Sequence, residues 1–146
     1  MLSWQRKLIY WTVSLLMVSG LIWLAAHWAM PSEQQLATDT AQINAKLAMC
    51  MQLKYWSIRV HTFVALVVLI VIGSLIPAHI LARWPLKRNI WSGVVNIAAF
   101  IVLTLTGYML WYVSEGGIKQ WATWLHWVIG MALPIVLAVH IKLGKT

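Results

Sequence analysis

Four long apolar runs constrain what this chain can fold into more than any other feature of its sequence. A helix that crosses a hydrocarbon core about 30 Å thick needs roughly 20 mostly apolar residues. Such runs occupy about residues 8–29, 57–82, 90–113 and 121–142 of the 146-residue chain. The chain is 62% hydrophobic and only 10% charged, unlike a soluble domain of this size. The sequence predicts an all-α integral membrane protein, with a four-transmembrane-helix bundle forming a single domain over residues 1–146.

The charges are unevenly distributed between the two sides that this topology defines. One side carries seven basic residues, which are Arg6, Lys7, Arg83, Lys87, Arg88, Lys142 and Lys145. The other side carries four basic and three acidic residues, which are Lys46, Lys54, Arg59, Lys119, Glu33, Asp39 and Glu115. Because cytoplasmic loops hold the excess of Lys and Arg, we expect both termini in the cytoplasm and the 30–56 loop outside. The net charge of +8 is then a topology signal, and nucleic acid is not an expected partner.

The 30–56 loop is the only sizeable segment outside the predicted spans. It begins polar and becomes amphipathic, with Leu47 and Met51 on one helical stripe. We interpret it as a short helix at the outer surface or under a partner, with a plain connecting loop as the alternative. Cys50 is the only cysteine, so the chain can form no intrachain disulfide, and it lacks the C-x-x-C-H run of covalently bound haem. No internal repeat is apparent.

Five histidines lie in or near the apolar runs, and they are His27, His61, His79, His126 and His140. Ionisable groups inside membrane spans are functional candidates by default, because burying one without a partner is costly. His61 and His79 are 18 residues apart, which on a helix is about five turns and about 27 Å. His126 and His140 are 14 residues apart, or about 21 Å. Each helix therefore presents two imidazoles on one stripe, one near each membrane surface.

The second and fourth spans both run inward, so His126 matches the depth of His61, and His140 that of His79. Two facing helices then give two His/His pairs stacked across the bilayer. Two neutral imidazoles from opposite sides are what a six-coordinate haem iron requires, and helix bundles commonly build cofactor sites in this way. Structural or proton-relaying histidines are the alternative. His27 is a candidate to hydrogen-bond a haem propionate, line a quinone pocket or replace His61 as a ligand, unless it is an interfacial residue without a cofactor role.

Gly93 and Gly107 on the third span are also 14 residues apart, at the inner and outer depths. A glycine lets a backbone approach a flat macrocycle because no Cβ intervenes. Ordinary helix packing through small residues is the alternative. Arg59, two residues before His61 on the less basic side, is a candidate partner for a haem propionate.

The segment "HWVIGMALPIVLAVH", residues 126–140, resembles transmembrane di-haem b-type cytochromes. Its His-x13-His spacing is similar to that in the cytochrome b of quinol:cytochrome c reductases, and the four-helix layout resembles the cytochrome b subunits of respiratory formate dehydrogenases and hydrogenases. The resemblance implies two haem b groups, with His61 and His126 as outer ligands and His79 and His140 as inner ones. The chain departs from the pattern in the 18-residue spacing of its second span, which a tilt of the helix or the bend expected at Pro77 would absorb, and in having no inner histidine on its first span.

Two bis-histidine haems have no open coordination position, so they favour electron transfer over oxygen or substrate chemistry. The 30–56 loop leaves no room for a catalytic domain. We therefore expect the membrane subunit of a respiratory oxidoreductase in a bacterial inner membrane, exchanging electrons between the quinone pool and a periplasmic redox protein. One alternative is a stand-alone small di-haem cytochrome that reacts with a diffusible redox species. Another is a His-based proton relay or transporter, although the spans hold no carboxylate except Glu115 at a margin.

Overall fold

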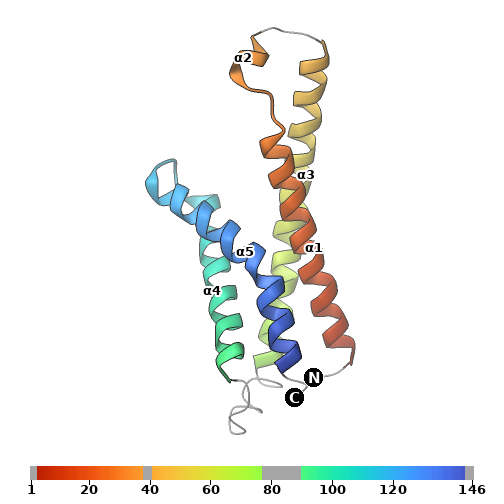
Figure 1. The fold of residues 1–146 in the computed structure, drawn as a ribbon, viewed down its shortest axis with the longest axis vertical. Helices are drawn as coiled ribbons and strands as arrows, with labels where there is room; N and C mark the ends of the chain where they lie inside the picture. Colours follow the sequence, from red (N-terminus) through yellow and green to blue (C-terminus); the bar gives the residue numbers. More distant parts are fainter. Residues whose placement is uncertain (1–2, 38–40, 77–89, 144–146) are drawn as a thin grey trace. The chain divides into compact units, whose positions relative to one another are not determined.

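The computed structural model describes residues 3–37, 41–76 and 90–143, and its regular secondary structure over these ranges is entirely helical (Figure 1). The helices are α1 (Ser3–Trp28), α2 (Glu33–Leu36), α3 (Ala41–Leu75), α4 (Ile90–Tyr112) and α5 (Gly117–Leu143). Four of them, α1, α3, α4 and α5, are long and apolar enough to cross a membrane. The prediction of an all-helical chain with four apolar helices of spanning length is confirmed, and we treat the chain as a multi-pass membrane protein.

The second long helix differs from its predicted bounds. α3 begins at Ala41 and not near residue 57, so most of the expected 30–56 loop is helix that continues directly into the apolar run. The segment "AQINAKLAMCMQLKYW" contains no Pro or Gly and is rich in strong helix formers, so nothing in it ends the helix at the membrane boundary. The separate surface helix and the plain loop are both corrected to an extension of α3. Residues 77–82 of the predicted span, with Pro77, lie outside the described residues.

Contacts divide the chain into two compact units, Met1–Ala78 and His79–Thr146, and each is described by itself. In the first unit α1 packs along α3, and in the second α4 packs along α5. The two long helices of each unit run in opposite directions (Figure 1). Each unit is thus an antiparallel helical hairpin, and the single four-helix domain stays a prediction.

The packed faces of α1 and α3 follow a seven-residue repeat. The buried residues of α1 include Gln5, Thr12, Ser19 and Ala26, each seven positions after the last. Those of α3 include one row at Ser57, Val64 and Val71, and a second at Val68 and Leu75. His61 lies seven residues before Val68, at the start of the second row. Such a repeat keeps one stripe of each helix against its partner, and small residues let membrane helices approach closely. We call the packed stripe between the two helices the seam. His61 lies on it and therefore faces α1.

The second unit packs in the same manner. His126, Leu133 and His140 stand seven residues apart on α5, and Ser92, Ala99 and Thr106 stand seven apart on α4. Hydrogen-bonding contacts at both ends, Ser92 with His140 and Thr106 with His126, show that these stripes face each other. The 14-residue spacing of the two histidines is therefore two heptads of helix packing.

Short polar connections join the helices of each unit. Between α4 and α5 the backbone turns at Gly116, whose φ of +144° is a value that residues with a side chain rarely adopt. Before α2, Ser32 and Gln35 form a capping box in which each side chain accepts from the other's backbone N–H. Gly116 thus permits the turn between α4 and α5, and the capping box starts α2.

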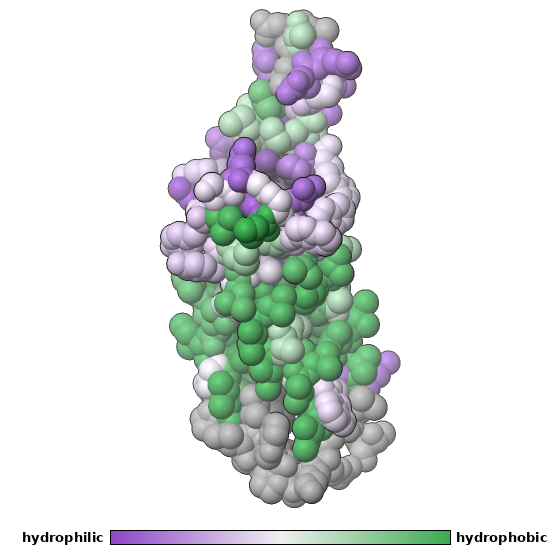
Figure 2. Space-filling view, turned by 90° about the vertical axis from the view of Figure 1, so that its left-hand side faces the viewer, coloured by the Kyte–Doolittle hydropathy of each residue, from purple (hydrophilic) through white to green (hydrophobic). Residues whose placement is uncertain are grey.

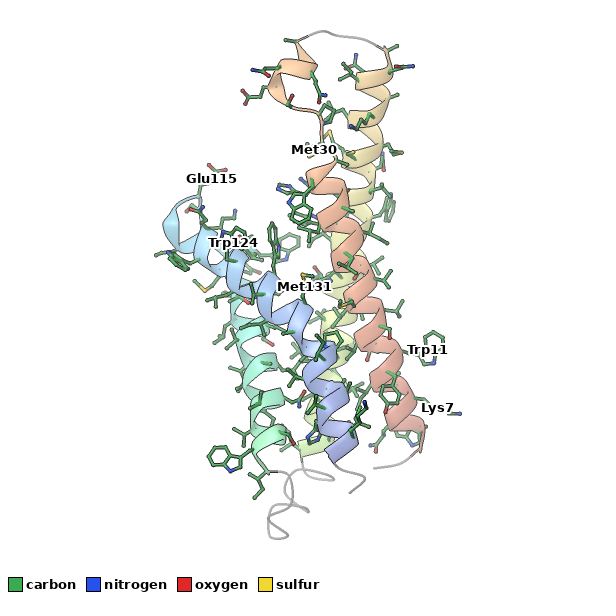
Figure 3. The ribbon with its side chains drawn as sticks, viewed as in Figure 1. Lys7, Trp11, Met30, Glu115, Trp124 and Met131 are labelled. Carbon is green, nitrogen blue, oxygen red and sulfur yellow. The ribbon has the colours of Figure 1, made fainter. Side chains whose placement is uncertain are left out.

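Apolar side chains cover the outward surfaces of the long helices. Hydrophobic residues dominate the helical shafts in Figure 2, and hydrophilic residues gather where α2 and the start of α3 lie. Trp11 and Ile70 are about three-quarters exposed, at 70% and 73%, and Figure 3 shows Trp11 and Lys7 projecting outward from α1. Large exposed apolar side chains along whole helices are expected where lipid is the solvent.

Candidate functional site

His61 lies between α3 and α1, where two oxygen atoms of α1 surround one of its ring nitrogens. His61 Nδ1 is 3.1 Å from Ser19 Oγ and 3.1 Å from the carbonyl oxygen of Leu16. Ser19 Oγ also donates to that carbonyl, at 3.0 Å. A carbonyl oxygen can only accept a hydrogen bond. The contact with Leu16 therefore requires the proton of the neutral imidazole to be on Nδ1, which leaves the lone pair on Nε2.

His126 is held in the same way at the other hairpin. His126 Nδ1 lies 2.9 Å from Thr106 Oγ1. The Thr106 hydroxyl lies 2.7 Å from the carbonyl oxygen of Val102 and 3.3 Å from that of Leu103, both on its own helix. Two oxygen atoms 2.7 Å apart need a proton between them, and a hydroxyl has only one to give. Thr106 Oγ1 therefore accepts from His126 Nδ1–H, and the lone pair of this ring is also on Nε2.

His140 has a hydroxyl partner as well. His140 Nδ1 lies 2.9 Å from Ser92 Oγ, and the backbone carbonyl of Ser92 accepts a hydrogen bond from Asn96 Nδ2 at 2.8 Å. The Asn96 side chain is buried, and its Oδ1 receives no hydrogen bond from the part of the chain that the structure describes. A buried acceptor without a donor costs stability until water or a ligand supplies one.

A glycine lies against each of these three imidazoles. A Cβ added at Gly20 would lie 3.4 Å from His61 Cε1, and one at Gly107 would lie 3.4 Å from His126 Cε1. The corresponding distance from Gly93 to His140 Cε1 is 3.7 Å. A Cβ at Gly20 or Gly107 would therefore lie at the lower limit of ordinary contact with the ring, whereas one at Gly93 would make an ordinary contact. Gly73 differs from them, because a Cβ there would meet nothing within 4 Å.

The same local element occurs three times across the two units. In each case a hydroxyl residue followed directly by glycine faces a histidine, and the dipeptides are Ser19-Gly20, Ser92-Gly93 and Thr106-Gly107. Ser19 and Thr106 are absent from the residues predicted from the sequence, and Ser92 is not among the predicted site residues. Their signal was the hydroxyl residue immediately before each glycine, which acquires meaning only when the facing helix is known.

His27 has the opposite hydrogen-bonding environment. Lys54 Nζ lies 3.4 Å from His27 Nδ1, 3.5 Å from Met30 Sδ and 5.2 Å from the centre of the Trp23 ring. The His27 ring stacks on Trp23 with centroids 5.1 Å apart. Because an ammonium group can only donate, His27 Nδ1 is an acceptor, and the proton of the neutral ring is on Nε2. This arrangement disfavours His27 as a substitute for His61 as ligand.

The other residues predicted from the sequence are divided between the two units. Arg59 is exposed and lies over the ring of Tyr55, 3.6 Å from its centre, one turn earlier on α3. His61 belongs to the first unit, whereas His126, His140, Gly93 and Gly107 belong to the second. Within the second unit, Gly107 is brought to His126 and Gly93 to His140. His79 lies outside the described residues.

The donor chemistry of His61 and His126 fits a haem iron. Iron in b-type haem takes the unprotonated nitrogen of a neutral imidazole, and a hydrogen bond from the other nitrogen sets the tautomer and the ring orientation. Both rings have this hydrogen bond, and both have it to oxygen atoms of a neighbouring helix. Comparison of the chain with protein families, with curated proteins and with solved structures finds no match. The function is therefore argued from the site.

Proposed function

We propose that this chain is a membrane electron-transfer subunit that holds two b-type haems, each between two histidines. The observation that carries the proposal is the environment of His61 and His126, whose Nδ1 atoms donate to oxygen atoms and whose Nε2 atoms keep the lone pair. Neutral, unprotonated Nε2 is the form in which histidine binds haem iron.

The proposed ligand pairs follow from chain direction. α3 and α5 both follow a helix of opposite direction in their own hairpin, so both run from the outer surface inward in the proposed topology. His61 and His126 then lie at the outer depth and hold one haem, while His79 and His140 hold the inner one. Gly93 and Gly107 leave space beside the ligands, and Arg59 is the proposed partner of an outer propionate.

A bis-histidine haem, when bound, accepts and releases one electron at an iron that has no open coordination position. The chain's own residues bind the macrocycle, exclude water with their apolar surroundings and keep the ligands neutral. We propose that electrons pass between the quinone pool and a periplasmic redox protein, in a bacterial inner membrane with both termini of the chain in the cytoplasm. Moving one electron across the membrane gains or costs about 2.3 kcal/mol of free energy per 100 mV of membrane potential, depending on its direction.

The direct test is a dithionite-reduced minus oxidised absorption spectrum of the purified chain, with haem quantified as the pyridine haemochrome. We expect two b-type haems per chain in the wild type, and loss of one in each of His126→Ala and His140→Ala. His27→Ala is the matched control, because its Nδ1 accepts from Lys54, and it should keep both haems. A wild-type protein without haem would contradict the proposal and favour the proton relay.

A further inference from the structure

We propose that Thr106 is a positioning residue that holds His126 in the one tautomer that can bind iron through Nε2, and that Ser19, together with the carbonyl of Leu16, positions His61 in the same way. This inference rests on the proposed haem function and deepens it. Neither hydroxyl is a ligand, because each lies at Nδ1, the nitrogen that does not bind the metal. Each acts on the proposed cofactor only through its histidine.

The direction of both hydrogen bonds is set by the helix that carries the hydroxyl. Ser19 donates its only proton to the carbonyl of Leu16, and Thr106 donates its own to the carbonyl of Val102. Each oxygen is left with lone pairs alone to offer the imidazole. Because these carbonyls belong to α1 and α4 themselves, the preference for Nδ1–H exists before any cofactor binds.

The neighbouring glycine limits the ring in a second way. The Thr106 hydroxyl touches Nδ1 of His126 and Gly107 lies beside Cε1, so two adjacent ring atoms face α4. Ser19 and Gly20 make the same two contacts with His61. Turning either ring over would place a carbon where the hydroxyl now accepts a proton, which removes the hydrogen bond. The dipeptide therefore selects the orientation of the ring as well as its tautomer.

The hydroxyls should also influence the redox potential. An imidazole that donates a hydrogen bond from Nδ1 is a more basic ligand, and basic ligands stabilise oxidised iron. Loss of such a partner typically lowers metal affinity by about 10–100-fold. Removing either hydroxyl should therefore weaken haem retention and move the midpoint potential of the outer haem to a more positive value.

The chain offers closely matched variants for the test. Thr106→Val removes the acceptor at nearly constant volume, and Thr106→Ser restores it. Thr104→Val is the control, since the exposed Thr104 hydroxyl donates to Phe100 on the same helix. Ser19→Ala is compared with Ser74→Ala, because Ser74 donates to Val71 with the same i−3 pattern as Ser19.

Two readouts are measured on the full-length protein in detergent. Nitrogen NMR of histidine-labelled, haem-free protein reports the tautomer of each ring, and a redox titration of the haem-loaded protein reports the potentials. We expect His61 and His126 to be Nδ1-protonated in the wild type. In Thr106→Val, the His126 signal should shift toward a mixture of tautomers, with a more positive potential for one haem. Thr106→Ser, Thr104→Val and Ser74→Ala should match the wild type.

The variants also test which histidines share a haem. If His61 and His126 bind the same iron, Ser19→Ala and Thr106→Val shift the same spectral component. Ser92→Ala, which acts on His140, should shift the other component.

Failure of this inference can be told apart from failure of the proposed function. A wild type that binds two haems, with Thr106→Val unchanged in the His126 tautomer and in potential, would overturn the positioning role and leave the haem function standing. Ser19→Ala is judged by the potential alone, because the Leu16 carbonyl still accepts from His61 Nδ1 in that variant. A wild type that binds no haem would overturn both. Nε2-protonated His61 and His126 in the haem-free protein would also overturn the positioning role.

Discussion

At the scale of single residues, what lies at Nδ1 separates two kinds of histidine in this chain. Nδ1 of His61 and of His126 donates a hydrogen bond to an oxygen atom of the facing helix. Nδ1 of His27 instead accepts a hydrogen bond from the ammonium group of Lys54. The first arrangement leaves the lone pair on Nε2 and the second places a proton there. Residue type alone does not distinguish these cases, because all three are histidines in apolar helices.

Substitution of the glycines tests the space beside the imidazoles. Gly107→Ala would place a Cβ 3.4 Å from His126 Cε1, at the lower limit of ordinary van der Waals contact, so it would remove the space on that side of the ring. We expect Gly107→Ala to lower the haem content or to shift the spectrum of one haem. Gly73→Ala is the control, because a Cβ there meets nothing within 4 Å.

The control should differ from Gly107→Ala in stability as well as in haem content. Alanine is favoured over glycine inside a helix by roughly 0.5–1 kcal/mol, so Gly73→Ala should keep both haems and slightly raise the thermal unfolding temperature. Equal haem spectra for the two variants would refute a steric role for Gly107.

At the scale of the helices, the seven-residue seams decide which side chains meet. Ser19 belongs to the buried row of α1 that also holds Thr12 and Ala26, and His61 starts a row of α3. The seams place small or hydroxyl residues opposite each imidazole, so the binding environment of a histidine is a by-product of close helix packing. A change of register between α4 and α5 would separate Ser92 from His140 and Thr106 from His126 at once.

The packing of the extended start of α3 can be tested by cysteine labelling. Cys50 is 1% exposed on the seam side of α3, whereas the adjacent Met49 is 58% exposed. Met49→Cys in a Cys50→Ala background should therefore react rapidly with a membrane-impermeant maleimide in intact spheroplasts. The wild-type thiol should react only after denaturation. Equal labelling of the two proteins would show that Ala41–Tyr55 is not the packed helix described here.

At the scale of the whole molecule, the two hairpins repeat one design. Each has a first helix with a hydroxyl-glycine dipeptide and a second helix with the facing histidine. In the proposed function, each haem takes one histidine from each hairpin, so neither hairpin alone would complete a haem site. In the same proposal, His126 and His140 on α5 would belong to different haems, so this helix would join the outer haem site to the inner one.

The proposed orientation can be tested with the entire chain. A C-terminal green fluorescent protein fusion should be fluorescent, and a C-terminal alkaline phosphatase fusion inactive, because the excess of Lys and Arg on that side predicts a cytoplasmic C-terminus. A phosphatase fused within the α2 region, near Ser32, should be active. The reverse pattern would invert the membrane topology and place the partner protein on the cytoplasmic side.

The sequence by itself determined the helical class, the four apolar helices and the approximate bounds of α1, α4 and α5, because hydrophobic length is a local property of the chain. It also singled out the histidines by their cost in an apolar segment. It misplaced the start of α3, since a helix without a Pro or Gly stop ends where packing and solvent decide. Only the tertiary structure paired Ser19 with His61 and Thr106 with His126. A hydrogen bond between helices depends on their register, which no single segment encodes, and this register set the proton on Nδ1.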